Sequence, residues 1–126
     1  MEKKSVTLGE SELEIMKILW HAGQAVNTQY INHAAAKKNW KRTTISTYLA
    51  RLVEKGAIVC EKQGNQYFYQ AILLEEEYRK GQTKHLIQSL YAGSVKDFAV
   101  ALFREETLSK EEIAQLRAIF DEKEGE

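Results

Sequence analysis

The side chains best suited to chemistry in this sequence lie in the segment NWKRTTISTYLARLVEKGAI, residues 39–58. They are short hydroxyl and long basic side chains, carried by Lys41, Arg42, Thr43, Thr44, Ser46, Thr47 and Arg51. Short hydroxyl side chains let a backbone come near base edges, to which they donate or accept hydrogen bonds. Lysine and arginine reach phosphates, with an attraction that weakens as salt rises. The chemistry that this surface suits is the noncovalent recognition of double-stranded DNA.

An apolar stripe runs through the same segment. Its members recur at the spacing of one helical face and are Ile45, Tyr48, Leu49, Leu52 and Val53. This spacing predicts a helix that is anchored through its apolar side and ends at Gly56, the expected left-handed stop. The hydroxyl and basic side chains then lie on the outward side of that helix.

Two further helices are expected before this one. The first covers Leu8–Trp20, with Thr7 and Glu10 as a capping box at its start. The second covers residues 28–39, with Asn27 or Thr28 as its cap, after a short strand at Val26.

A β-hairpin is expected after the third helix. The segments IVCEK and QYFYQA flank QGN, in which Gly64 and Asn65 supply the turn. The polar residues near its tip that we assign to the DNA backbone are Lys62, Asn65 and Gln66. Tyr67 and Tyr69 are assigned mainly to the core, because alternating aromatic residues in a strand are more often packing residues.

Three helices followed by a hairpin is the order of a winged helix-turn-helix domain, whose third helix enters the major groove while the hairpin, or wing, touches the adjacent backbone. A face rich in Lys, Thr and Ser is by itself more often a solvated surface. Here six basic residues oppose only Glu54 between residues 37 and 55, on a third helix that a wing follows. That position favours DNA binding, and residues 1–73 are assigned to a DNA-binding domain.

Residues 74–126 are predicted to form three amphipathic helices, the last two of which begin at Ser94 with Asp97 and at Ser109 with Glu112 as capping pairs. So short a unit buries too little of its own surface to be stable alone, which predicts a homodimer joined through this dimerisation domain. The residues assigned to the interface are Leu86, Leu90, Phe98, Leu102, Phe103, Leu116 and Phe120. The fold class is mainly α with a small β-hairpin.

The charge is divided between these two halves. Residues 1–73 hold ten basic against six acidic residues, whereas residues 74–126 hold eight against twelve, so that the whole chain has a formal net charge of zero. The acidic half is expected to lie away from the phosphates. No apolar run has the length of a membrane span, and no signal peptide is recognisable, so a cytoplasmic location is expected.

Catalysis and metal binding find little support in the sequence. The three histidines are scattered, and no Ser/His/Asp order or cluster of metal ligands emerges. The one cysteine, Cys60, cannot form an internal disulfide and is interpreted as a small apolar filler in a strand. We predict no catalytic residue, no metal site, no cofactor and no small-molecule substrate.

Four segments of the sequence together resemble a known family. In chain order they are LGESELEIMKILW, TISTYLARLVEKGAI, QGNQYFY and LSKEEIAQLRAIF. The family that they resemble is the BlaI/MecI/CopY penicillinase-repressor family of bacterial winged-helix regulators, and the resemblance covers essentially the whole chain. The resemblance implies a homodimer that binds an inverted-repeat operator and represses nearby promoters, as of a β-lactam-resistance or related stress-response operon. It implies base-facing positions for Thr44 and Thr47 and a backbone-facing position for Arg51.

The sequence departs from the family pattern at four places. Lys41, Arg42 and Thr43 follow the tryptophan where the family often has Ser-Pro-Lys, and Asn65 stands where the wing commonly has arginine. The cysteine-rich metal site of copper-responsive members is absent. In β-lactam-responsive members, a membrane sensor protease system triggers cleavage of an Asn-Phe bond. The resemblance implies such a system as a further partner. The counterpart of the Asn-Phe bond here is Leu102–Phe103, for which we favour a structural role in an apolar stripe.

A winged helix that contacts proteins, without sequence-specific DNA binding, is the competing interpretation, because a fold does not dictate its ligand. Salt separates the two, since affinity for duplex DNA falls steeply as salt rises.

Overall fold

The computed structural model describes residues 6–104 and 108–125. Its elements, in chain order, are α1 (Glu10–Ala22), β1 (Val26–Asn27), α2 (Thr28–Ala34), the 3-10 helix η1 (Ala36–Lys38), α3 (Arg42–Glu54), β2 (Ile58–Gln63), β3 (Gln66–Ala71), α4 (Glu75–Tyr91), α5 (Val95–Arg104) and α6 (Lys110–Glu124). The chain divides into two compact units, which meet in sequence at Gly81 and Gln82. Each unit is described by itself below.

The strands of the first unit form an antiparallel sheet in the order β1-β3-β2. The hairpin register pairs Ile58 with Ala71 and Gln63 with Gln66, which leaves a two-residue turn at Gly64 and Asn65. Gly64 has a φ of 63°, a conformation that glycine adopts without steric cost. The three helices, the hairpin and the short first strand lie where the sequence predicts them, so the winged-helix fold class is confirmed. The second helix is shorter than predicted, because α2 ends at Ala34 and the stretch predicted up to residue 39 continues as η1.

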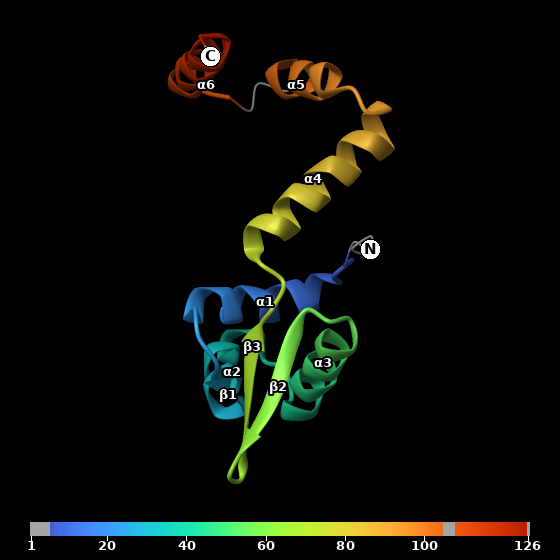
Figure 1. Cartoon of the computed structure of the whole chain (residues 1–126), viewed down its shortest axis with the longest axis vertical. Coiled ribbons are helices and arrows are strands. Elements are labelled where there is room, and N and C mark those ends of the chain that lie inside the picture. The colour runs from blue at the N-terminus through green and yellow to red at the C-terminus, as the bar shows by residue number, and fades with distance from the viewer. Residues whose placement is uncertain (1–5, 105–107, 126) are drawn as a thin grey trace. The chain divides into compact units, whose positions relative to one another are not determined.

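The helices of this unit lie at the sides and at one end of the sheet (Figure 1). Figure 1 shows α3 on one side of the hairpin, α2 with β1 on the other, and α1 across the end of the sheet opposite the turn. The prediction of a capping box at Thr7 and Glu10 is wrong by two residues. Helix α1 is instead capped at Gly9, whose backbone N–H donates to Glu12 Oε1 over 2.8 Å. Glu12 is buried and folds back to this N–H, whereas Glu10 is exposed.

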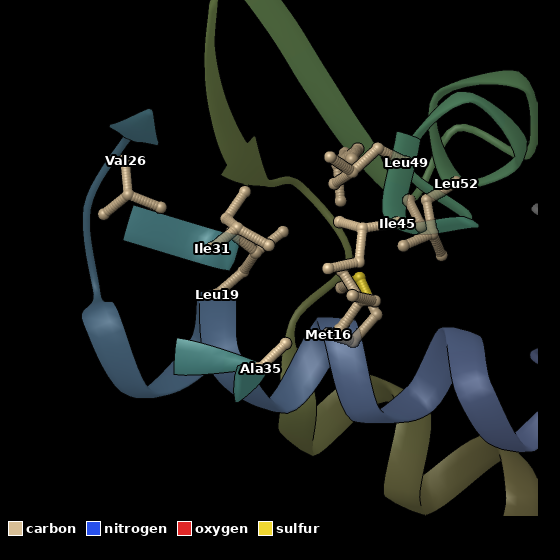
Figure 2. Close-up of a cluster of buried hydrophobic side chains, with 11 residues drawn as sticks. Met16, Leu19, Val26, Ile31, Ala35, Ile45, Leu49 and Leu52 are labelled. Carbon is tan, nitrogen blue, oxygen red and sulfur yellow. The ribbon is translucent and has the colours of Figure 1, made fainter. Parts of the chain in front are cut away.

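A buried apolar core joins the three helices and fixes the orientation of α3. Figure 2 shows side chains from α1, α2 and α3 converging, among them Met16, Ile31 and Ile45. Of the predicted stripe on α3, Ile45, Leu49 and Leu52 are buried and Tyr48 is partly buried. Val53 is exposed, because each residue turns a helix by about 100° and carries Val53 past the buried arc.

The predicted stop of α3 at Gly56 is present. Gly56 has a φ of 78°, its N–H donates to Val53 O over 3.0 Å, and the N–H of Ala57 donates to Leu52 O over 3.0 Å. This pair of bonds satisfies the last carbonyls of the helix and turns the chain into β2.

The second unit has its helices where the sequence predicts them. Ser94 Oγ accepts from the N–H of Asp97 over 3.1 Å, and Ser109 Oγ accepts from the N–H of Glu112 over 3.1 Å, so both predicted caps are confirmed. Among the described residues of α4, α5 and α6, none is buried. Most of the predicted interface is exposed, namely Leu86, Leu90, Leu102, Phe103 and Phe120, while Phe98 and Leu116 are partly buried.

Candidate nucleic-acid interface

The outward face of α3 carries the polar residues singled out in the sequence. Side chains exposed there are those of Lys41, Arg42, Thr43, Ser46, Thr47 and Arg51, whereas Thr44 is partly buried. They are brought onto one surface because Ile45, Leu49 and Leu52 hold the opposite side of α3 in the core. The small side chain of Ala50 lies among them and is also exposed, so a flat partner can approach the helix closely.

The hydroxyl group of Thr47 has a defined hydrogen-bonding role. Thr47 Oγ1 lies 2.9 Å from the carbonyl oxygen of Thr43, one turn earlier in α3. A carbonyl oxygen only accepts, so the hydroxyl must donate to it. What Thr47 offers to a partner is therefore an acceptor lone pair and a methyl group. In the major groove these suit the amino groups of adenine or cytosine and the methyl group of thymine.

The N-terminus of α3 is open to an anionic partner. The N-cap, Lys41, makes no side-chain capping hydrogen bond, so its side chain leaves the first-turn amides of this 13-residue helix uncapped. Beside it is a concavity of about 570 Å³ between α2 and the start of α3. Its lining includes Thr28, Gln29, His33 and Arg42, which are donors suited to a phosphate.

The wing presents its three predicted residues at the surface. Lys62, Asn65 and Gln66 are all exposed. Lys62 Nζ lies 5.7 Å from the centroid of the Tyr67 ring, and Gln66 Oε1 accepts a 3.1 Å hydrogen bond from Asn27 Nδ2. The hydrogen bond between Asn27 and Gln66 connects the tip of the wing to the start of α2.

Two sequence interpretations of the wing are wrong. Tyr69 is partly buried against the core, but Tyr67 is exposed. The reason is that β1 reaches only as far as Phe68 along β3, so Tyr67 lies beyond the sheet's covered part. Cys60 stands in β2 as expected but is exposed, so it fills no space in the core.

Sequence reasoning placed the start of α2 correctly but did not assign it to the candidate surface. Thr28 and Gln29 line the concavity beside α3 and also a second one, of about 200 Å³, against the wing residues Asn65, Gln66 and Tyr67. They connect the two parts of the candidate surface. The available signal was the Asn27 cap, which brings the polar residues after it to the first turn of a helix.

Within residues 6–104 and 108–125, no group of three or more His, Cys, Asp or Glu side chains could hold a metal ion. No helix in that part of the chain is long and apolar enough to cross a membrane.

Three helices, a three-stranded sheet with a wing, and a polar third helix turned outward define a winged-helix DNA-binding protein. A sequence model described as Penicillinase repressor matches residues 8–122. The chain belongs to the penicillinase repressor family. This is a family of transcriptional repressors and not of enzymes, and the chain is a DNA-binding repressor of that class.

Relatives match over nearly the whole chain. The penicillinase repressor of Bacillus licheniformis is 28% identical, with 95% of this chain and 94% of the relative covered. The methicillin resistance regulatory protein MecI of Staphylococcus aureus is 28% identical, with 98% and 100% covered. A protein of Latilactobacillus sakei, called an uncharacterized 16.5 kDa protein in the ptsI 3' region, is 32% identical, with 98% and 84% covered.

Two solved structures of BlaI resemble the first part of the chain. The solution structure of the DNA-binding domain of the repressor BlaI gives a TM-score of 0.53 at 33% identity, covering 61% of this chain and 94% of that one. The monomeric form of Bacillus licheniformis BlaI in complex with the blaP half-operator gives 0.51 at 33% identity, with the same coverage.

Proposed function

We propose that the chain represses transcription as a homodimer that binds an inverted-repeat operator. In this proposal each α3 enters a major groove and each wing contacts the adjacent backbone, with the two helices spaced by about one turn of B-DNA or a multiple of it. The observation that carries it is the exposed face of α3, where Thr43, Ser46 and Thr47 project between basic flanks. The similar structure of monomeric Bacillus licheniformis BlaI is of a complex with the blaP half-operator, which supports operator DNA as the partner.

Within that surface, Thr44 and Thr47 are proposed to face base edges, and Lys41, Arg42 and Arg51 to meet phosphates. Thr43 and Ser46 border the groove. Lys62, Asn65 and Gln66 of the wing would reach the backbone outside the groove, and Thr28 and Gln29 would complete the contact between helix and wing. Bound DNA would then exclude polymerase from the promoter.

The second unit supports the dimer. None of the described residues of α4, α5 and α6 is buried, and large apolar side chains among them are exposed to solvent. Leu90 is 71% exposed and Phe120 is 60% exposed. Apolar side chains left in water cost free energy that a second copy of the chain would recover by covering them. We therefore assign dimerisation to residues 74–126, and cytoplasmic repression of a β-lactam-resistance or related stress-response operon to the assembled protein.

Footprinting on the DNA that flanks the protein's own gene tests the proposal. The expected result is a protected pair of inverted half-sites, bound with an affinity that falls steeply between low and moderate salt. Sedimentation should give a dimer. Affinity that is insensitive to salt and independent of duplex DNA would instead favour a winged helix that contacts proteins.

A further inference from the structure

A partly buried ion pair joins the start of α1 to the end of α3. Lys55 Nζ lies 2.6 Å from Glu12 Oε1 and also donates to the carbonyl oxygen of Thr7 over 2.8 Å. The same Glu12 oxygen accepts the N–H of Gly9 over 2.8 Å. The side chain of Glu12 is 8% exposed and that of Lys55 is 36% exposed. The carboxylate therefore lies beneath the surface and holds a cation at the edge of it.

The carboxylate of Glu12 stays ionised despite its burial. Burial alone would raise the pKa of Glu12, but the hydrogen bonds from Lys55 and Gly9 outweigh it, and the pKa lies below its ordinary value. Its second oxygen, Oε2, is buried without a hydrogen-bond partner among the described residues. An ionised and only partly satisfied carboxylate makes the Lys55 ammonium costly to release.

Lys55 and Arg51 differ in what holds them. They are one helical turn apart, since the N–H of Lys55 donates to the carbonyl oxygen of Arg51 over 2.9 Å. The charge of Arg51 also lowers the pKa of Glu12, so both cations lie near the carboxylate. Of these two cations, only Lys55 is hydrogen-bonded to the carboxylate among the described contacts, and the exposed guanidinium of Arg51 can bind a partner.

We propose that Glu12 is a positioning residue that withholds Lys55 from the DNA backbone, and thereby lowers the sequence-independent affinity of the protein for duplex DNA. The proposal rests on the DNA-binding function proposed above. Each further phosphate contact strengthens binding to any duplex equally, without carrying sequence information. Retaining Lys55 in an internal ion pair removes one such contact, so the protein binds every duplex less tightly and its affinity depends less on salt.

Two substitutions on the surface of α3 test the proposal without disturbing the core. The quantity measured is the slope of log affinity against log salt for a random duplex. Lys55→Gln should leave this slope as in the wild type, because Lys55 makes no phosphate contact. Arg51→Gln, one turn earlier, should flatten it by about 0.9, the change expected for one lost contact. A flattening of that size in Lys55→Gln would overturn the proposal.

Glu12→Gln tests the carboxylate itself, because it keeps the shape and the acceptor for Gly9 while removing the charge. Lys55 is then free to contact a phosphate, so the slope should steepen by about 0.9, for the operator and for a random duplex alike. Adding Lys55→Gln to this variant should restore the wild-type slope. Glu10→Gln, an exposed carboxylate of the same turn, is the control and should change nothing.

An unchanged slope in Glu12→Gln, or equal weakening toward both duplexes at a constant slope, would mean that Glu12 is only structural. Wild-type protein whose duplex affinity does not depend on salt would refute the proposed function itself. That result is visible in the wild-type measurement before any variant is compared.

Discussion

The indole Nε1 of Trp20 donates a 2.7 Å hydrogen bond to the carbonyl oxygen of Leu73. The two residues are 53 positions apart in sequence, and the bond fastens the end of α1 to the segment between β3 and α4. The Trp20 ring also lies 6.1 Å from that of Tyr78, in the first turns of α4. Trp20 therefore fixes where the chain leaves the sheet of the first unit.

Replacing Trp20 with Phe should destabilise the first unit. The change keeps an aromatic ring near Tyr78 but leaves the carbonyl of Leu73 without its donor, at a cost of about 1–3 kcal/mol if water does not replace it. Urea unfolding measures the loss. Trp40→Phe is the matched control, because Trp40 contacts Tyr48 edge-on at 5.3 Å but makes no hydrogen bond through its indole in the described structure. Equal losses in both variants would show that ring volume, not the hydrogen bond, matters.

Substitutions of Thr47 should separate its acceptor from its methyl group. Thr47→Val keeps the shape and removes the acceptor, while Thr47→Ser keeps the acceptor and removes the methyl. If α3 contacts base edges, one of the two variants should lose discrimination between operator and random duplex, by a binding free energy of about 1–3 kcal/mol. The variant with the larger loss shows whether the acceptor or the methyl group contacts the base. Competition binding measures this discrimination. Were neither variant to change it, Thr47 would not face a base edge, and Thr44→Ala would then test the other proposed position.

A charge placed on the apolar surface of the second unit should produce monomers. Leu90→Glu puts a carboxylate where we expect the partner chain, and dimer dissociation should become at least about tenfold easier, or about 1.4 kcal/mol. Sedimentation velocity measures the dissociation constant. Ile72→Glu is the control, since Ile72 is also an exposed apolar residue but belongs to the first unit. Dimers that persist in Leu90→Glu would exclude this part of α4 from the interface.

The stability of the first unit should depend on pH through Glu12. Because the pKa of Glu12 is lowered in the folded protein, the unfolded chain binds the proton more readily. The ion pair then contributes fully above the unfolded pKa, and its contribution is lost as the pH falls through the folded pKa. Urea midpoints measured from neutral to acidic pH should fall less steeply for Glu12→Gln than for the wild type.

Glu14→Gln serves as the comparison for that measurement. A hydrogen bond from Lys17 lowers the pKa of Glu14 as well, but the side chain of Glu14 is 31% exposed, against 8% for Glu12, so its ion pairs are more strongly screened by solvent. Its replacement should alter the pH dependence less than that of Glu12. The reverse order would assign the acid sensitivity to the surface of α1.

The sequence allowed the helices and wing to be predicted because their signals are local. The spacing of Ile45, Leu49 and Leu52 and the glycine at position 56 define α3 within its own segment. The exposure of Tyr67 depends instead on β1, a strand that ends 40 positions earlier in the chain. Val26 pairs with Tyr69 and Asn27 with Phe68, so the pairing with β1 stops one residue short of Tyr67. No single segment contains that information.

The candidate site shows the same division. The polar face of α3 follows from helical periodicity, whereas the contribution of Thr28 and Gln29 follows from the packing of α2 against the wing. The pairing of Glu12 with Lys55 spans 43 positions and has no short-range signature. Ion pairs of that kind require the assembled core to bring their partners together.

The exposed thiol of Cys60 has a practical consequence. It is the one cysteine of the sequence and stands on β2, the first strand of the wing. A spin label or fluorophore attached to it would mark each wing without any engineered site. In a symmetric pair of chains, the distance between the two labels would report the distance between the two wings. That distance could be measured with and without bound DNA.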